Sequence, residues 1–162
     1  MRISLLLISF ITAFNASATE IKAKVIKVLD GDTIDVIADY LPANLLVTQI
    51  PQRVRLLNID APEKGQAFGR WSGEQLKTLV AGKFVIVNYD SSDRYGRLLG
   101  RVSVNGIDIN HQMISVGAAW VYDQYNADTA LPALQKEAQE QRRGLWAESN
   151  PIPPWEWRHR KN

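Results

Sequence analysis

The chain has 162 residues, no cysteine, two histidines, 46% hydrophobic residues and a formal net charge of +2. This length corresponds to about one domain and is sufficient to bury a hydrophobic core. The composition excludes a disulfide framework, a thiolate zinc site, a cysteine nucleophile and a histidine-rich metal site. The nearly balanced charge does not by itself indicate a nucleic-acid-binding protein. The side chains that remain available for catalysis or ligand binding are carboxylates, arginines, lysines and hydroxyls.

Residues 1–18 (MRISLLLISFITAFNASA) have the pattern of a secretory signal peptide. Arg2 supplies the positive charge, residues 3–14 are mostly apolar, and residues 16–18 (ASA) form a small-residue cleavage site. The alternative is a short buried strand or helix, which does not explain why these features occur in this order. The apolar run is short for a membrane span, which needs about 20 residues. We therefore expect an exported protein, periplasmic or extracellular, whose mature chain begins at Thr19 without a membrane anchor.

The first half of the mature chain predicts short strands separated by turns. Residues 21–29 (IKAKVIKVL) alternate in the manner of a strand, residues 30–33 (DGDT) form a turn, and residues 34–36 continue the alternation. Residues 39–52 contain two prolines and predict a long hairpin loop or an insertion. Residues 54–59 predict a third strand that is apolar on nearly every position.

The second half predicts helices and two further strands. Residues 66–81 predict an amphipathic helix that stops at Gly82. Residues 84–89 and 98–104 predict strands on either side of a polar turn. Asp108 is suited to cap a short helix that follows it.

The last third predicts a strand, a helix and a tail. Residues 118–122 predict a final strand, and Leu131, Leu134 and Ala138 recur at helical spacing. Five short strands and about three helices predict a β-barrel with helices (α+β), and the five-stranded OB barrel is the natural candidate. Residues 19–148 would form this domain. Residues 149–162 would form a Pro-, Trp- and Arg-rich tail with a disordered basic end, pinned to the barrel by its tryptophans.

Three carboxylates stand at turns or strand ends. Asp32 shares strand parity with core positions, so it either caps the turn or holds a cation. Asp60 and Glu63 lie three residues apart and repel each other unless a proton or a cation lies between them. The alternative is a solvated acidic turn. With only two histidines available, a glutamate is the natural general base for activating water.

Two arginines, Arg55 and Arg97, join these three carboxylates as candidate site residues. Arg55 lies between apolar residues, so it predicts either an internal salt bridge or a phosphate contact. It is five residues from Asp60, and an odd separation places the two on opposite faces unless the strand twists, bulges or ends early. Arg97 follows Gly96 in a polar turn and can project a fork-shaped guanidinium toward a phosphate. Together these five residues predict phosphodiester hydrolysis, in which a cation and the arginines neutralise the phosphorane while Glu63 takes a proton from water.

The same stretches resemble the staphylococcal nuclease (thermonuclease) family. The matching motifs are VLDGDT at residues 28–33, VRLLNIDAPE at 54–63, DRYGR at 93–97 and GLW at 144–146. They occur in the family's order and span most of the mature chain. The end of the tail, PPWEWR at residues 153–158, is also similar to that of bacterial relatives.

This resemblance implies an OB-fold endonuclease of DNA and RNA that depends on calcium, or on another divalent cation, and leaves 3′-phosphate ends. It implies roles for ten residues, which are metal binding by Asp32, Asp60 and the main-chain oxygen of Ala61, contact with the scissile phosphate by Arg55 and Arg97, general-base catalysis by Glu63, terminal-phosphate binding by Arg94 and Tyr95, and a nucleotide-binding wall of Trp120 and Tyr122. We expect a monomer that prefers single-stranded or unpaired substrates. The alternatives are a non-catalytic OB module that binds single-stranded nucleic acid and a phosphatase of small phosphoesters.

Overall fold

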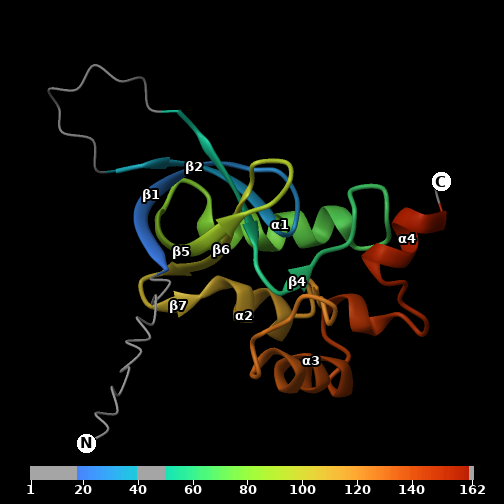
Figure 1. The fold of residues 1–162 in the computed structure, drawn as a ribbon. Coiled ribbons are helices and arrows are strands. Elements are labelled where there is room, and N and C mark those ends of the chain that lie inside the picture. The colour runs from blue at the N-terminus through green and yellow to red at the C-terminus, as the bar shows by residue number, and fades with distance from the viewer. Residues whose placement is uncertain (1–17, 40–49, 161–162) are drawn as a thin grey trace, which may run out of the picture.

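A computed structural model describes residues 18–39 and 50–160. The predicted signal peptide, apart from its last residue, and most of the predicted loop at residues 39–52 lie outside these ranges. The described elements follow one another as β1 (Thr19–Val28), β2 (Thr33–Ala38), β3 (Gln52–Leu56), β4 (Ile59–Asp60), α1 (Gly69–Val80), β5 (Phe84–Ser92), β6 (Leu98–Val104), β7 (Ile107–Asp108), α2 (Ile109–Ser115), β8 (Trp120–Val121), α3 (Leu131–Glu140), a 3-10 helix (Gly144–Ala147) and α4 (Pro154–Arg160) (Figure 1).

A closed barrel forms the centre of the fold. Strands β3, β2, β1, β5 and β6 are neighbours in that order through antiparallel pairs, and a parallel pairing between β3 and β6 closes the barrel. In β1 the alternation predicted from the sequence places Ile21, Ala23 and Val25 in the core, and a bulge follows between Val25 and Lys27. The predicted five-stranded OB-type barrel with helices is therefore confirmed.

The third strand ends earlier than the sequence predicted. β3 stops at Leu56, the chain turns at Leu57 and Asn58, and Ile59 begins the separate strand β4. Asn58 has a φ of 66°, a left-handed conformation that asparagine tolerates better than most residues. β4 pairs with β8 in a second sheet of two strands. The expectation of one continuous strand over residues 54–59 was wrong, and the break reverses which face Asp60 presents.

The helices pack around the barrel and extend the core. α1 begins at Gly69 rather than near residue 66, because Phe68 is left-handed, and it buries Leu76 and Val80. The side chain of Asp108 caps α2, as predicted, by accepting a hydrogen bond from the amide of His111. No helix of the described ranges is long and apolar enough to cross a membrane.

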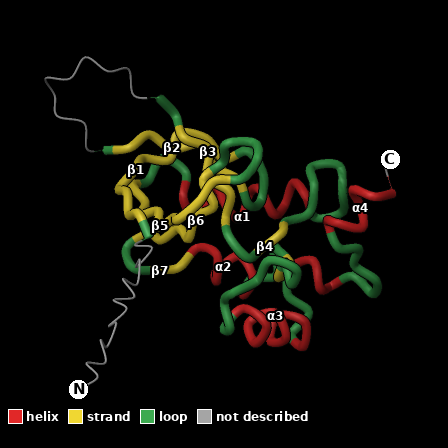
Figure 2. Tube along the Cα trace, in the orientation of Figure 1, coloured by secondary structure: helices red, strands yellow, loops and turns green. Residues whose placement is uncertain are grey.

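The C-terminal segment up to Arg160 is part of the fold. α4 lies at the end of the molecule away from β1 and β5, with α1 and β4 between them (Figures 1 and 2). Trp155 on α4 contacts Trp120 and Tyr122 at and beyond β8, so the prediction that tryptophans pin the tail is confirmed for Trp155, which packs beside the two-stranded sheet of β4 and β8 rather than on the barrel. The prediction that the basic end is disordered was wrong for Arg158, His159 and Arg160, which belong to this helix.

Candidate active site

Asp32 lies in the turn between β1 and β2 and is 6% exposed. Its Oδ2 accepts a hydrogen bond of 2.7 Å from the amide of Ala61, and its Oδ1 accepts one of 2.9 Å from the hydroxyl of Thr33. The turn is pressed against α1, because a Cβ at Gly31 would lie 1.9 Å from the hydroxyl oxygen of Ser72. Glycine therefore allows the turn to approach α1 closely enough for Asp32 to reach the segment after β4.

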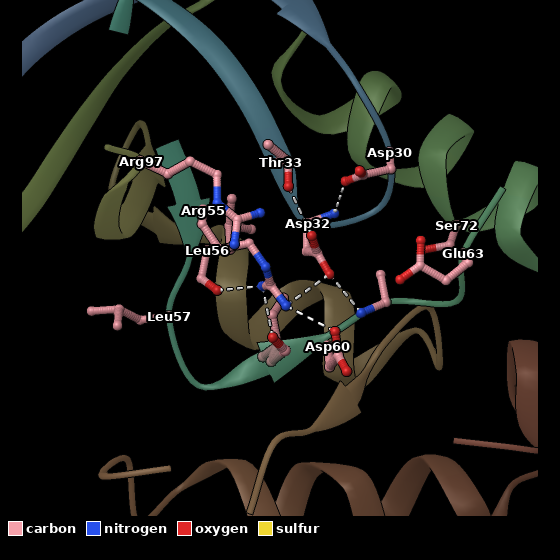
Figure 3. A network of polar contacts seen from close by, with 12 residues as sticks. Asp30, Asp32, Thr33, Arg55, Leu56, Leu57, Asp60, Glu63, Ser72 and Arg97 are labelled. Carbon is pink, nitrogen blue, oxygen red and sulfur yellow. Dashed lines mark hydrogen bonds and ion pairs between the residues drawn. The ribbon is translucent and has the colours of Figure 1, made fainter. Parts of the chain in front are cut away.

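Arg55 joins the two aspartates (Figure 3). Its Nη2 donates to Asp60 Oδ1 at 2.9 Å and lies 3.2 Å from Asp32 Oδ2. Its Nη1 donates to the carbonyl oxygens of Leu56 and Ile59, each at 2.8 Å. The side chain is 12% exposed, so the buried guanidinium has the carboxylate partners that it needs. The internal salt bridge is thus present, and the turn between β3 and β4 resolves the parity conflict between Arg55 and Asp60.

Asn110 on α2 fixes that turn. It is 3% exposed, its side-chain nitrogen donates to the carbonyl of Leu57 at 3.0 Å, and its side-chain oxygen accepts from the amide of Val102 at 3.0 Å. The turn is thereby tied to β6 of the barrel. This residue was not predicted from the sequence, because an asparagine in a short amphipathic helix carries no signal for its partners.

Burial and the repulsion between neighbouring carboxylates change the pKa values of acidic groups in the site. Desolvation and then the charge of Asp32 raise the pKa of Asp30 to about 6. Desolvation also raises the pKa of Asp60, against the opposing effects of Arg158 and Arg55. Burial is the largest cause of both shifts, so the ionised forms of these two carboxyls are poorly solvated at the β1–β2 turn and at β4.

Arg97 projects from the β5–β6 turn toward the group formed by Asp32 and Arg55 (Figure 3). Its Nε donates to Asp93 Oδ2 at 2.7 Å, and both of its terminal nitrogens are without a hydrogen-bond partner among the described residues. Desolvation acts to raise the pKa of Asp93, but the hydrogen bonds from Arg97 and Tyr95 outweigh it and lower this pKa below its usual value. An ionised Asp93 therefore holds one side of Arg97 and leaves the other side of the fork available to a phosphate.

Arg94 and Tyr95 belong to the same turn but not to the acidic group. Arg94 donates to the hydroxyl of Tyr95 at 2.7 Å, and Tyr95 is 68% exposed. The guanidinium of Arg97 lies 5.6 Å from the Tyr95 ring centre. The three side chains thus form one exposed basic and aromatic cluster.

Glu63 forms a hydrogen bond with a residue that the sequence analysis did not place in the site. Its Oε1 accepts a hydrogen bond of 2.9 Å from Arg158 Nη1, and Arg158 Nη2 donates to Asp60 Oδ2 at 2.8 Å. Because the sequence predicted a disordered end here, Arg158 was missed as a residue of the site. The only available signal was the PPWEWR ending, whose helix brings an arginine back to residues far away in the chain.

The aromatic residues predicted to bind substrate face the C-terminal helix. Trp155 is stacked on Tyr122, with ring centres 5.5 Å apart and an angle of 5° between the planes. Trp120 makes edge contacts with Trp146 and Trp155. One face of the predicted wall is therefore occupied by the protein's own side chains.

The donor set suits a hard cation. Asp32 and Asp60 present oxygens to the same nitrogen of Arg55, so these oxygens lie within reach of a common ion. No three acidic or histidine side chains within residues 18–39 and 50–160 converge as a ready metal cage. Magnesium and calcium accept oxygen ligands and complete their shells with water, so two carboxylates and a neighbouring carbonyl are sufficient. The pKa of Asp30, raised by burial and by its carboxylate neighbour, indicates that a positive charge here would relieve repulsion.

The structure thus brings Asp32, Arg55, Asp60 and Ala61 into one hydrogen-bonded network, and it places Arg97 and Glu63 at its border (Figure 3). It places Arg94 and Tyr95 in the exposed hairpin, and Trp120 and Tyr122 beside α4.

The sequence has close relatives among known proteins. A family model described as staphylococcal nuclease homologue matches residues 53–148. An uncharacterized endonuclease of Escherichia coli O157:H7 is 49% identical over 162 residues, covering 99% of this chain and 100% of that protein. A micrococcal nuclease of Shigella flexneri is 39% identical over 150 residues, covering 86% of this chain and 81% of that protein. With the motifs, the barrel and these relatives in agreement, the chain belongs to the staphylococcal nuclease family.

Proposed function

We propose that the protein is an exported nuclease that hydrolyses phosphodiester bonds of DNA and RNA with the help of calcium. The observation that carries this proposal is the network of Asp32, Arg55 and Asp60 with the open fork of Arg97 directed toward it (Figure 3). The network combines anionic ligands for a cation with guanidinium groups for a phosphate. Hydrolysis of a phosphodiester requires both, because negative charge grows on the phosphate oxygens in the transition state.

In this proposal Asp32, Asp60 and the carbonyl of Ala61 hold the cation. When bound, the cation supplies Lewis acidity and neutralises charge on the phosphate. Arg97 binds the phosphate through the nitrogens that Asp93 leaves unoccupied. Arg55 is the second phosphate contact in this proposal: when the cation takes Asp32 and Asp60 as ligands, the Nη2 that these aspartates hold is released toward the phosphate.

Glu63 is proposed as the general base. Its side chain is 43% exposed, so water has access to its carboxylate. It lies beside Asp60 through their common contact with Arg158, which places it at the edge of the proposed cation site. Attack from this side, with loss of the 5′ oxygen, would leave the 3′-phosphate ends that the family resemblance implies.

A basic groove supports a polymeric substrate. A cavity of about 930 Å³ runs along β1 and α1, is lined by Lys27, Lys64, Arg70 and Lys77, and reaches Asp30. Lys64 follows Glu63 directly, so the groove leads away from the proposed site. We propose that it receives the backbone of a single-stranded or locally unpaired nucleic acid, and that Arg94 and Tyr95 contact a terminal phosphate on the side of the hairpin.

The N-terminal pattern supports export of a mature chain from Thr19 to the periplasm or the medium. Expression of the full chain followed by N-terminal sequencing of the secreted product tests this part. The first residue is expected to be Thr19. An intact N-terminus on protein retained in the cytoplasm would contradict it.

The activity is tested by incubating the mature protein with plasmid, single-stranded DNA and RNA in calcium, and then in EDTA. We expect cleavage in calcium, loss of cleavage in EDTA, and fragments that polynucleotide ligase accepts at the 3′ end only after phosphatase treatment. The exposed rings of Tyr95 and Tyr125 favour a second candidate, a non-catalytic module that binds single strands through aromatic rings. Binding without cleavage in any divalent cation would select this module.

A further inference from the structure

Arg158 is the residue of the C-terminal helix that enters the candidate active site. Its Nη2 donates to Asp60 Oδ2 at 2.8 Å, and its Nη1 lies 2.9 Å from Glu63 Oε1 and 3.3 Å from Asp60 Oδ1. The guanidinium therefore spans two carboxylates that belong to one short segment. Desolvation acts to lower the pKa of Arg158, but its hydrogen bonds to Asp60 and Glu63 outweigh this effect and raise it, so the group is charged.

Glu63 depends on this contact for its orientation. Arg158 hydrogen-bonds to its carboxylate, and among the described residues no other side chain forms a hydrogen bond or an ion pair with these oxygens. Asp60 is 2% exposed and belongs to the same segment, so an ionised Asp60 with no cation between the two carboxylates would repel Glu63 toward solvent. A fork-shaped guanidinium bridges two carboxylates in a fixed geometry, which a point charge does not.

The helix that carries Arg158 is itself fixed. Trp155 stacks on Tyr122, and Gln66 Nε2 donates to the carbonyl of Ile152 at 2.6 Å just before the helix. Gln66 Oε1 also accepts from the amide of Glu63 at 3.1 Å. The tail and the Glu63 segment are therefore joined at two points, through Gln66 and through Arg158.

We propose that Arg158 is a positioning residue for the reaction: it holds the carboxylate of Glu63 beside Asp60, where Glu63 can accept a proton from the attacking water. The inference rests on the proposed function. It assigns the C-terminal helix to the catalytic unit, although the matched family model ends at residue 148. The opposite interpretation is that Arg158 is an inhibitory counter-cation, which a divalent ion must displace from Asp60.

Steady-state kinetics with calcium separate these interpretations. Arg158→Gln is expected to lower kcat about 100-fold, in the range of a lost general base, with KM within about threefold. The matched control is Arg160→Gln, because Arg160 lies on the same helix and pairs with the exposed Glu156 instead of with the site. The control is expected to keep the wild-type kcat. Unchanged or increased kcat in Arg158→Gln would overturn the proposal, and an increase accompanied by tighter calcium binding in calorimetry would identify the counter-cation.

A double-mutant cycle tests whether Arg158 acts through Glu63. If it does, Arg158→Gln combined with Glu63→Gln is no slower than Glu63→Gln alone, because the second change removes nothing further. Independent, multiplying losses would overturn the proposal. Arg158→Lys keeps the charge but not the fork, and it is expected to show an intermediate loss. This variant carries the cycle if Arg158→Gln does not fold.

The same cycle in melting temperature, measured in EDTA, reports the contact without reference to activity. We expect the double variant to melt at about the temperature of the less stable single variant. Additive decreases would overturn the Arg158–Glu63 contact. If wild-type protein cleaves nothing while the melting temperatures remain coupled, the proposed function fails and the contact stands as a structural one.

Discussion

Arg55 combines two roles that the sequence presented as alternatives. It forms an internal ion pair with Asp32 and Asp60, and this ion pair lies in the candidate site rather than in the barrel core. Removing such a buried partner leaves charges uncompensated. Arg55 is therefore a poor position for separating chemistry from stability, whereas Arg97 has an anchor on one side and open nitrogens on the other.

Arg97→Ala is expected to lower kcat by about 100–1,000-fold, because the developing phosphate charge no longer has this donor. The melting temperature should change little, since the partner of Arg97 is a carboxylate in a surface turn. Initial rates on single-stranded DNA with a parallel thermal melt measure both effects. Ser92→Ala, at the exposed end of β5 beside the same turn, is the control. An equal decrease of kcat in both variants would point to disruption of the hairpin instead.

The raised pKa of Asp30 predicts how the free energy of unfolding of the metal-free protein depends on pH. Its folded-state pKa is about 6 against an ordinary 3.8, so the folded state holds a proton that the unfolded chain releases first. The stability contributed by this proton is complete below about pH 4 and is lost as the pH rises through about 6. Asp30→Asn should flatten the pH dependence of the free energy of unfolding across this window and raise stability at pH 7. Urea titrations in EDTA check this, and a variant less stable than wild type at pH 7 would contradict it.

The turns between strands, more than the strands and helices themselves, position the residues of the candidate site. The β1–β2 turn carries Asp32, the β3–β4 turn reverses the chain between Arg55 and Asp60, and the β5–β6 turn carries Arg97. Each turn is held by a specific approach, such as that of Gly31 to Ser72 or that of Asn110 to Leu57. The site therefore depends on backbone fit as well as on its charged side chains.

Gly31→Ala is expected to destabilise the protein and to weaken calcium binding, because its Cβ would collide with Ser72 and with the Cβ of Ala61, 2.7 Å away. The cost should be at the upper end of typical point mutations, about 3 kcal/mol. Gly73→Ala on α1 is the matched control, since its Cβ would meet Asp30 only at 3.7 Å and alanine favours the helix. Chemical denaturation and calorimetric calcium titration of both variants test this, and similar stability of the two would refute the collision.

The sequence predicted what repeats regularly and missed what depends on a single backbone angle or a remote partner. The alternation in β1 and the capping role of Asp108 could be predicted from the neighbouring residues in the sequence. The break after Leu56 depends on a left-handed Asn58, which a run of apolar residues does not signal. Arg158 could not be placed, because its partners lie 98 and 95 residues away and no local pattern encodes such a distance. The motifs identified Asp32, Arg55 and Asp60 as a set, and folding supplies the turn that lets them meet.

At the scale of the whole molecule, the small net charge does not reflect how charged side chains are grouped locally. The net charge is only +2, yet the groove along β1 and α1 gathers Lys27, Lys64, Arg70 and Lys77 against Asp30 and Glu74. Affinity for a polyanion should therefore depend on this groove and on the hairpin, rather than on the surface as a whole.

Lys27→Ala combined with Lys77→Ala is expected to raise KM for long single-stranded DNA and to leave kcat unchanged. The slope of log affinity against log salt should decrease by about 0.7 for each phosphate that the variant no longer neutralises. Fluorescence anisotropy over a series of salt concentrations measures the slope. Lys136→Ala on α3, whose side chain is 77% exposed, is the control and should behave as wild type. An unchanged slope in the double variant would exclude the groove as the path of the strand.

The parallel pairing of β3 with β6, which closes the barrel, has a consequence for the cell that makes the protein. Arg55 is paired with Leu99 between these two strands, so strands from distant parts of the chain must associate before Arg55 and Arg97 come together. Such long-range closure forms late in folding compared with local hairpins. Under the proposed export and nuclease activity, a nascent or translocating chain would therefore have no assembled site and would leave the nucleic acids of its producer intact until the chain completes its fold.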